Sequence, residues 1–307
     1  MSARRAGLGL LLAAAACDGD PKPSPPGPAS AATPSAVALA SAAPSASVPT
    51  RHPKIAPATR PGCRVIALSG EVKEDDTVLA NGTVIYGTRW LRLAKGASLT
   101  LRHTVSSREV SLEGPGLALP CLEGEEDTLL AEGTFESTAG PGARPGAEVV
   151  VFTPTGTVSY GDAQISLRAS KAKSEVTTSK GEAWVLPSKD ATRKGPEKLG
   201  GPKDKTTLTA KGGVEPLVAE CERSAGEAEG LARAVLTPTA GDGGTLGDRA
   251  AAHLKARKVA RGACGSARAA AATEPDAAKR AGLEKRVEEA GKRWRSLGTP
   301  GPKSSGD

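Results

Sequence analysis

The 307-residue chain is rich in glycine and proline, which together fill 61 positions (37 plus 24), and it has only seven aromatic residues. A chain of this length can form two modest domains, but this composition indicates that much of it is not core. Its net charge of +7 does not indicate nucleic-acid binding, because residues 63–187, which hold six of the seven aromatics, carry 12 basic and 16 acidic side chains. The basic segments elsewhere lack aromatic side chains on which bases stack.

The first 17 residues have the build of a secretory signal. Arg4 and Arg5 precede an apolar run at residues 6–16, which is too short for the ~20 residues of a membrane span. The end of the run, Ala-Ala-Ala-Cys at 14–17, resembles the lipobox of bacterial lipoproteins, although Ala14 stands where leucine is usual. The resemblance implies a signal peptide at 1–16 and a lipidated Cys17 that anchors the chain in a membrane, facing the periplasm. A plain signal peptide with a chance cysteine is the alternative.

Residues 17–62 follow as the lipidated cysteine and a tether built almost wholly from proline, alanine, serine and threonine. Such a segment has too few large apolar residues to offset the entropy of folding. As a flexible coil, its roughly 45 residues span about 35 to 40 Å. A linker without a tuned length is an equally good interpretation.

Short strands with glycine-rich turns are predicted for residues 63–187. Leu91, Leu93, Leu99 and Leu101 alternate with polar residues, which indicates strands with one buried face. Residues 149–153 form a strand that is apolar on both faces. We expect two hairpins beyond it, one around Gly161-Asp162 and one around Lys180-Gly181. The pattern favours an all-β sandwich or a solenoid-like sheet.

Several motifs in this region resemble the periplasmic domain of the FecR family. They are Gly70-Glu71-Val72, the LRLAKGASLTLRH strand pair, the EGPG turn at 113–116, the VVVFTPTG segment and the closing SKGEAWVL hairpin. FecR-type proteins sense an outer-membrane transporter and signal to a sigma factor through a transmembrane helix and a cytoplasmic segment, neither of which we find in this sequence. The chain also departs from the family at Gly161-Asp162-Ala163-Gln164, where a Gly-Thr-x-Phe strand is usual. The resemblance therefore implies the fold more than the signalling role.

The four cysteines that follow Cys17 are candidates for disulfides, as expected behind a secretory signal. We favour Cys63 with Cys121, which closes the first half of the β domain, and Cys221 with Cys264, which antiparallel helices would bring together. The two other pairings, or free thiols, stay open. Closing the first loop contributes about 4 kcal/mol by the chain-entropy estimate.

No motif for catalysis, a cofactor or a metal is evident. The acidic runs at 74–76 and 123–127 lack the ligand spacing of a calcium loop and are interpreted as solvated turns. His103 ends a strand without a second histidine nearby in the sequence, so we expect a structural histidine.

The rest of the chain changes character. Residues 188–213 are predicted to be a basic linker, residues 214–298 a small helical hairpin or three-helix unit, and residues 299–307 a disordered tail. Apolar residues every three or four positions mark the helices, at about 217–238, 248–272 and from Pro275 onward. The basic stretch at 253–261 is interpreted as a solvated helix face rather than a contact with lipid headgroups or anionic polymer. The expected fold class is thus α+β by segments.

Together these features predict a non-enzymatic, lipid-anchored envelope protein. Its FecR-like domain would bind another envelope component, either a protein or part of the cell wall. One alternative is a regulatory subunit of a sigma-factor-linked pathway that acts with a membrane-spanning partner. Another is a secreted hydrolase, which is disfavoured because no catalytic constellation is found.

Overall fold

The computed structural model describes residues 61–138, 148–236 and 245–295. The predicted signal peptide, Cys17, the tether up to residue 60 and the C-terminal tail lie outside these residues.

The described part of the chain holds fifteen strands, one 3₁₀ helix and three α-helices. The strands of the first half are β1 (Cys63–Ser69), β2 (Val72–Glu74), β3 (Thr77–Val78), β4 (Val84–Ile85), β5 (Leu91–Leu93), β6 (Ser98–His103), β7 (Glu109–Leu119) and β8 (Thr128–Thr138). The strands of the second half are β9 (Val149–Thr153), β10 (Gly156–Tyr160), β11 (Gln164–Ala169), β12 (Lys173–Lys180), β13 (Ala183–Pro187), β14 (Glu197–Leu199) and β15 (Asp204–Thr209). The helices are η1 (Leu122–Gly124), α1 (Val214–Leu236), α2 (Leu246–Ala271) and α3 (Ala277–Arg295).

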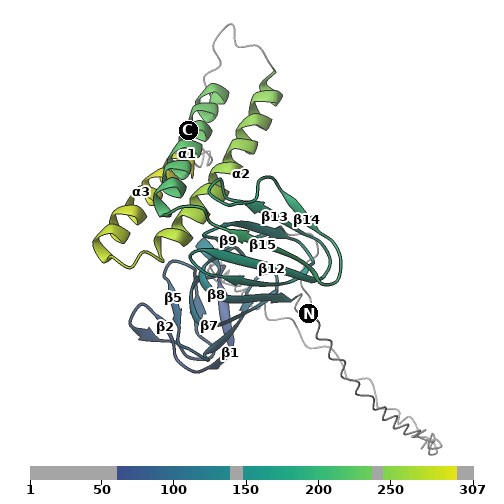
Figure 1. The fold of residues 1–307 in the computed structure, drawn as a ribbon, viewed down its shortest axis with the longest axis vertical. Coiled ribbons are helices and arrows are strands. Elements are labelled where there is room, and N and C mark those ends of the chain that lie inside the picture. Colours follow the sequence, from purple (N-terminus) through teal and green to yellow (C-terminus); the bar gives the residue numbers. More distant parts are fainter. Residues whose placement is uncertain (1–60, 139–147, 237–244, 296–307) are drawn as a thin grey trace, which may run out of the picture. The chain divides into compact units, whose positions relative to one another are not determined.

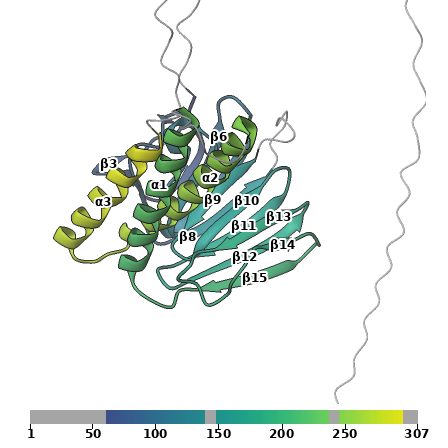
Figure 2. The same ribbon diagram turned by 90° about the horizontal axis from the view of Figure 1, so that it is seen from above.

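The strands form two rows that share β7 and β8 (Figures 1 and 2). One row runs β3-β2-β5-β7-β8-β9-β10-β13-β14, and the other runs β4-β1-β6-β7-β8-β11-β12-β15. Both shared strands change partners along their length. In β7 the register shifts between Glu113 and Leu117. β8 pairs with β9 at its start but with β11 from Gly133 onward, and the φ of +113° at Gly133 suits glycine. A common hydrophobic core takes side chains from both rows, as in a sandwich.

The alternation predicted for the first half is confirmed. Leu91, Leu93, Leu99 and Leu101 are buried in the core, while the arginines between them face solvent. In β9 both faces are buried, as the sequence predicts. Val149 and Val151 join the sandwich core, whereas Val150 and Phe152 belong to a second apolar cluster on the outer face. The described fold is mixed α+β, with strands first and helices after them.

The two predicted hairpins of the second half are wrong. β10 pairs with β9 and β13, and β11 pairs with β8 and β12, so the chain passes from one row to the other at Gly161-Asp162. It crosses back at Gly181, because β12 pairs with β11 and β15 rather than with β13. Turn residues mark where a strand ends, but packing across the sandwich decides which strand becomes its neighbour.

The linker predicted at 188–213 is also wrong, because this segment contains β14 and β15. These strands end the two rows. They bury the side chains of Leu199, Thr206 and Leu208. Lysines are common on edge strands, where they discourage pairing with other chains. The lysines of β14 and β15 occupy exposed positions. They make the segment look like a basic linker, so the short alternation of buried residues between them is not evident from the sequence.

The three helices form the predicted helical unit. Leu217, Cys221 and Ala225 of α1 pack against α2 and α3 in one apolar cluster, which includes Leu283 and Val287. Thr245 and Asp248 form a capping box that starts α2. None of the described helices is long and apolar enough to span a membrane.

The helical unit rests on the outer face of the strand row at β8, β9 and β10 through α2 (Figure 1). Gly265 makes this close approach possible, since a Cβ placed there would lie 2.2 Å from the Phe152 ring. Two ion pairs flank the contact, Lys258 with Glu148 at 2.9 Å and Arg261 with the buried Asp127. α2 therefore covers β9 but leaves part of the sheet beside it uncovered.

Candidate functional site

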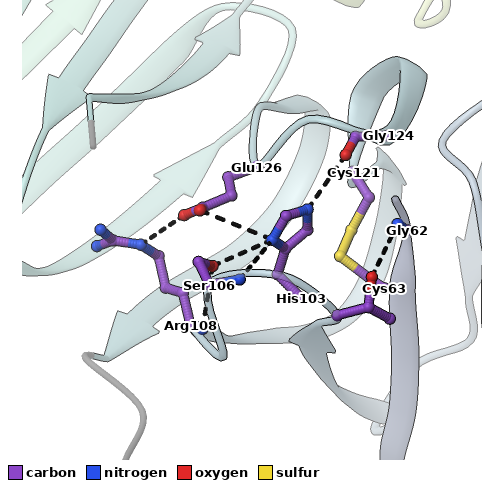
Figure 3. The surroundings of a disulfide bond; sticks show 9 residues. Gly62, Cys63, His103, Ser106, Arg108, Cys121, Gly124 and Glu126 are labelled. Atoms are coloured by element: carbon purple, nitrogen blue, oxygen red, sulfur yellow. Dashed lines mark hydrogen bonds and ion pairs between the residues drawn. A yellow bond between two sulfur atoms is a disulfide. The ribbon is translucent and has the colours of Figure 1, made fainter. Parts of the chain in front are cut away.

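The four cysteines within the described residues are joined in two pairs, Cys63 with Cys121 and Cys221 with Cys264. Beside the first disulfide lies His103, the histidine that ends β6 (Figure 3). Its Nε2–H donates to the Gly124 carbonyl at 3.1 Å, and its Nδ1 accepts from the Ser106 backbone N–H at 3.2 Å. Both ring nitrogens of this buried residue are satisfied, so His103 is structural, as the sequence predicts.

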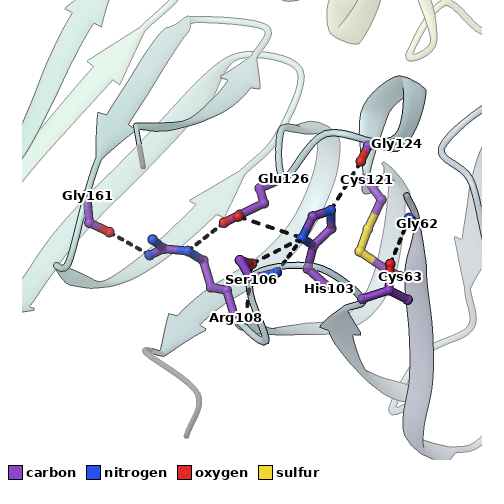
Figure 4. Close-up of polar contacts among 10 residues, drawn as sticks. Gly62, Cys63, His103, Ser106, Arg108, Cys121, Gly124, Glu126 and Gly161 are labelled. Atoms are coloured by element: carbon purple, nitrogen blue, oxygen red, sulfur yellow. Dashed lines mark hydrogen bonds and ion pairs between the residues drawn. A yellow bond between two sulfur atoms is a disulfide. The ribbon is translucent and has the colours of Figure 1, made fainter. Parts of the chain in front are cut away.

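Arg108 links the two halves of the sheet from a buried position (Figure 4). Its Nε donates to Glu126 at 2.7 Å, and its Nη1 donates to the Gly161 carbonyl at 2.5 Å. The guanidinium also lies 5.5 Å from the centre of the Tyr160 ring. Burial raises the pKa of the Tyr160 hydroxyl, because the low-dielectric surroundings disfavour the charged phenolate. This network fixes the loop at Gly161 where the chain crosses between the two rows.

The acidic run at 123–127 is only partly the solvated turn that we predicted. Glu126 is the partner of Arg108, and Asp127 is 3% exposed. Asp127 accepts from the Val150 backbone N–H at 3.0 Å and pairs with Arg261 of α2. Among the described residues, no group of three histidine, cysteine or acidic side chains is placed to hold a metal ion.

The candidate binding site is an apolar groove between α2 and the outer face of β10 and β13. Trp184 and Leu186 of β13 are 50% and 47% exposed, and Leu254 of α2 is 62% exposed. All three line a hollow of about 310 Å³, together with Val150, Phe152, Pro196 and Trp294. Large exposed apolar side chains that gather around a hollow are typical of binding surfaces.

The strand register explains why this groove is hollow. Trp184 pairs with Ser159 and Leu186 pairs with Thr157, so two large side chains stand next to two small ones on the outer face. On the other side of β10, Phe152 is already covered by α2. The groove is the uncovered strip between the helix and β13.

The rim of the apolar groove is basic on the helix side. Arg257, Lys258 and Arg261 line it, and Lys198 lies 5.8 Å from the centre of the Trp184 ring. Most of the stretch 253–261 is exposed, as predicted for a solvated helix face, and only Ala260 is buried. The prediction missed that Arg257, Lys258 and Arg261 also line a groove, because α2 packs beside β9 and β10.

A second hollow of about 750 Å³, here called the arginine cleft, adjoins the apolar groove. Phe152, Arg257, Arg261 and Trp294 line both hollows. Its other walls are formed by Trp90, Leu122 and the acidic run on the sheet side and by Arg268, Glu284, Glu288 and Arg295 on the helix side. The arginine cleft thus carries charges of both signs between two tryptophans.

Sequence reasoning did not single out Trp184 as a surface residue. The signal that marks it lies in the segment Ala183–Pro187, where both alternating sets of residues are apolar. One set, Ala183 and Val185, fills the core, so the other set must face outward. An outward pair of tryptophan and leucine on a strand near a sheet edge indicates a surface that is covered by something else.

No family model and no curated protein matches this chain. Among solved structures, two crystal structures of a putative anti-sigma factor from Parabacteroides distasonis ATCC 8503 are similar to it, with 12% and 11% sequence identity and a TM-score of 0.31 in each case. Each match covers 43% of this chain and 64% of that protein. The chain thus spans less than two thirds of the length of the protein that it matches.

Proposed function

We propose that this protein is a non-enzymatic, lipid-anchored envelope protein that binds an extended segment of another envelope protein in the apolar groove. The observation that carries the proposal is the exposure of Trp184, Leu186 and Leu254 around one hollow. The FecR-like character of residues 63–187 and the anchor at Cys17 belong to the same proposal and rest on their sequence motifs.

The shape and charge of the groove favour a protein segment as the occupant. The groove is concave, so a flat membrane surface would not reach its floor. Its apolar floor suits aliphatic or aromatic side chains, and Arg257 on the rim suits acidic ones. Lys258 on the same rim is already paired with Glu148. An extended segment presents alternate side chains to such a strip.

Site-specific crosslinking in living cells tests this proposal. A photo-crosslinking amino acid replaces Leu186 in the full chain, and in a matched control it replaces Val78, which is 58% exposed on β3, away from the groove. We expect a covalent adduct with one envelope protein from position 186, none from position 78, and loss of the adduct when Trp184→Ser is added.

Adducts that are the same at both positions, or adducts with lipid or glycan alone, would show that the groove does not bind a protein. The identity of the captured protein also separates the two functional interpretations. A sigma-regulating membrane protein would assign the chain to envelope signalling, whereas a structural envelope protein would exclude that role.

A further inference from the structure

We infer that the apolar groove and the arginine cleft bind one continuous segment of the partner, which carries a single carboxylate about five residues beyond its apolar side chains. This inference rests on the proposed function, since it specifies the ligand of the same site. It is carried by the placement of Arg268 and by the spacing of the arginines along α2.

Arg268 lies half-buried in the arginine cleft without a direct ion pair in the described part of the chain. Its guanidinium makes no hydrogen bond to a described residue, and Glu123, Glu284 and Glu288 act on its charge only from beyond salt-bridge distance. Burial lowers the pKa of Arg268, because removing the guanidinium from water disfavours its charged form. Guanidinium and carboxylate groups form two parallel hydrogen bonds, and a desolvated arginine is the usual receptor for such a group.

Most carboxylates of the cleft are already engaged with other cations. Asp127 pairs with Arg261, Glu123 with Arg295 at 3.4 Å, and Glu288 with Lys292 at 2.8 Å. The cleft carboxylates that have no ion pair among the described residues are Glu125 and Glu284. Because they face the same hollow, the site suits one incoming carboxylate and repels a run of several.

The helix sets the spacing. Lys258 lies beside the apolar groove, and Arg268 lies ten residues further along α2. Ten helical residues span about 15 Å, and an extended strand covers about 3.3 Å per residue. A segment that runs along α2 with its apolar side chains beside Lys258 therefore brings its fifth following residue, approximately, to Arg268.

Synthetic peptides test the inference. Each has a neutral N-terminal fluorophore, two leucines, one to seven serines, one aspartate and an amidated C-terminus, and its affinity for the full chain is measured by fluorescence anisotropy. We expect the tightest binding with about four serines. A companion peptide that ends in a free terminal carboxylate in place of the aspartate shows whether a side chain or a chain terminus is the better source of the charge.

Variants of the protein then test whether Arg268 is the residue that binds the carboxylate of the peptide. Arg268→Met is expected to weaken the best peptide about tenfold and to make it bind like its asparagine counterpart. Arg268→Lys should retain part of the preference, and Arg92→Met, which changes an exposed arginine on β5, should have no effect. Binding that needs Trp184 but is indifferent to the aspartate and its spacing overturns the inference and leaves the proposed function standing. If no leucine peptide binds, both fail.

Discussion

The buried ion pair of Arg108 and Glu126 gives the sharpest test of the fold. Arg108→Met keeps the aliphatic stem in place but removes the charge, the bond to the Gly161 carbonyl and the contact with Tyr160. The side chains of Arg108 and Glu126 are 2% and 14% exposed, so the substitution leaves the glutamate as a buried charge with only the His103 ring nearby, whose Nδ1 lies 3.7 Å from its Oε1. Such a change costs about 3 to 5 kcal/mol.

Urea unfolding of the full chain, followed by circular dichroism, measures this cost. Arg102→Met is the matched control, because Arg102 forms a 2.9 Å bond with Glu109 on the neighbouring exposed surface, where the loss should be at most about 1 kcal/mol. Adding Glu126→Gln to Arg108→Met removes the orphaned charge. The double variant should therefore recover about 1 to 3 kcal/mol relative to the sum of the two single losses.

A loss for Arg108→Met no greater than that of the control would refute this reasoning. Additive effects of the two substitutions would do the same, because they would mean that the charges do not depend on each other. A changed slope of the denaturant dependence would instead indicate an altered unfolded or native state, and the comparison would then be made from unfolding rates.

Three further predictions concern the helices and the anchor. Gly265→Ala should destabilise the protein by about 1 to 3 kcal/mol in the same assay, because its Cβ meets an aromatic ring at 2.2 Å, whereas Gly262→Ala, whose Cβ has 3.7 Å of space, should be neutral or stabilising. The hydrogen bond from Arg286 lowers the pKa of Glu222 in the folded protein. The free energy of unfolding should therefore fall as the pH drops from about 4.3, the pKa of an unfolded glutamate, through the lower pKa of the folded state. Glu222→Gln should flatten this part of the plot of stability against pH. Cys17→Ser should remove the acyl mass from the mature protein, and an unacylated wild type would disprove the anchor.

How far the sequence alone predicts the structure depends on how local the signal is. The apolar stripe of Leu283, Val287 and Ala290 repeats every three or four residues, and α3 buries those side chains as expected. The alternation at Leu91 and Leu93 is equally local, because each strand shows its own buried face. Such patterns need no knowledge of what lies on the other side of the core.

Pairing and exposure were harder to predict because they depend on distant partners. The turn at Gly161 looks like the tip of a hairpin, yet the strands on either side of it belong to different rows. Arg108, more than fifty residues earlier, holds that crossing in place through the Gly161 carbonyl. A local pattern cannot reveal an interaction of this kind.

The apolar groove exists because α2 covers the sheet only in part. Gly265 lets the helix settle on Phe152, and the ion pair of Arg261 with Asp127 holds it there, one strand short of Trp184. Arg261 therefore both positions the helix and lines the groove, so a ligand that draws this arginine away from Asp127 would also loosen the helical unit. Binding and helix placement should consequently be coupled. A ligand that leaves the Arg261–Asp127 ion pair intact should bind without the free-energy cost of breaking it.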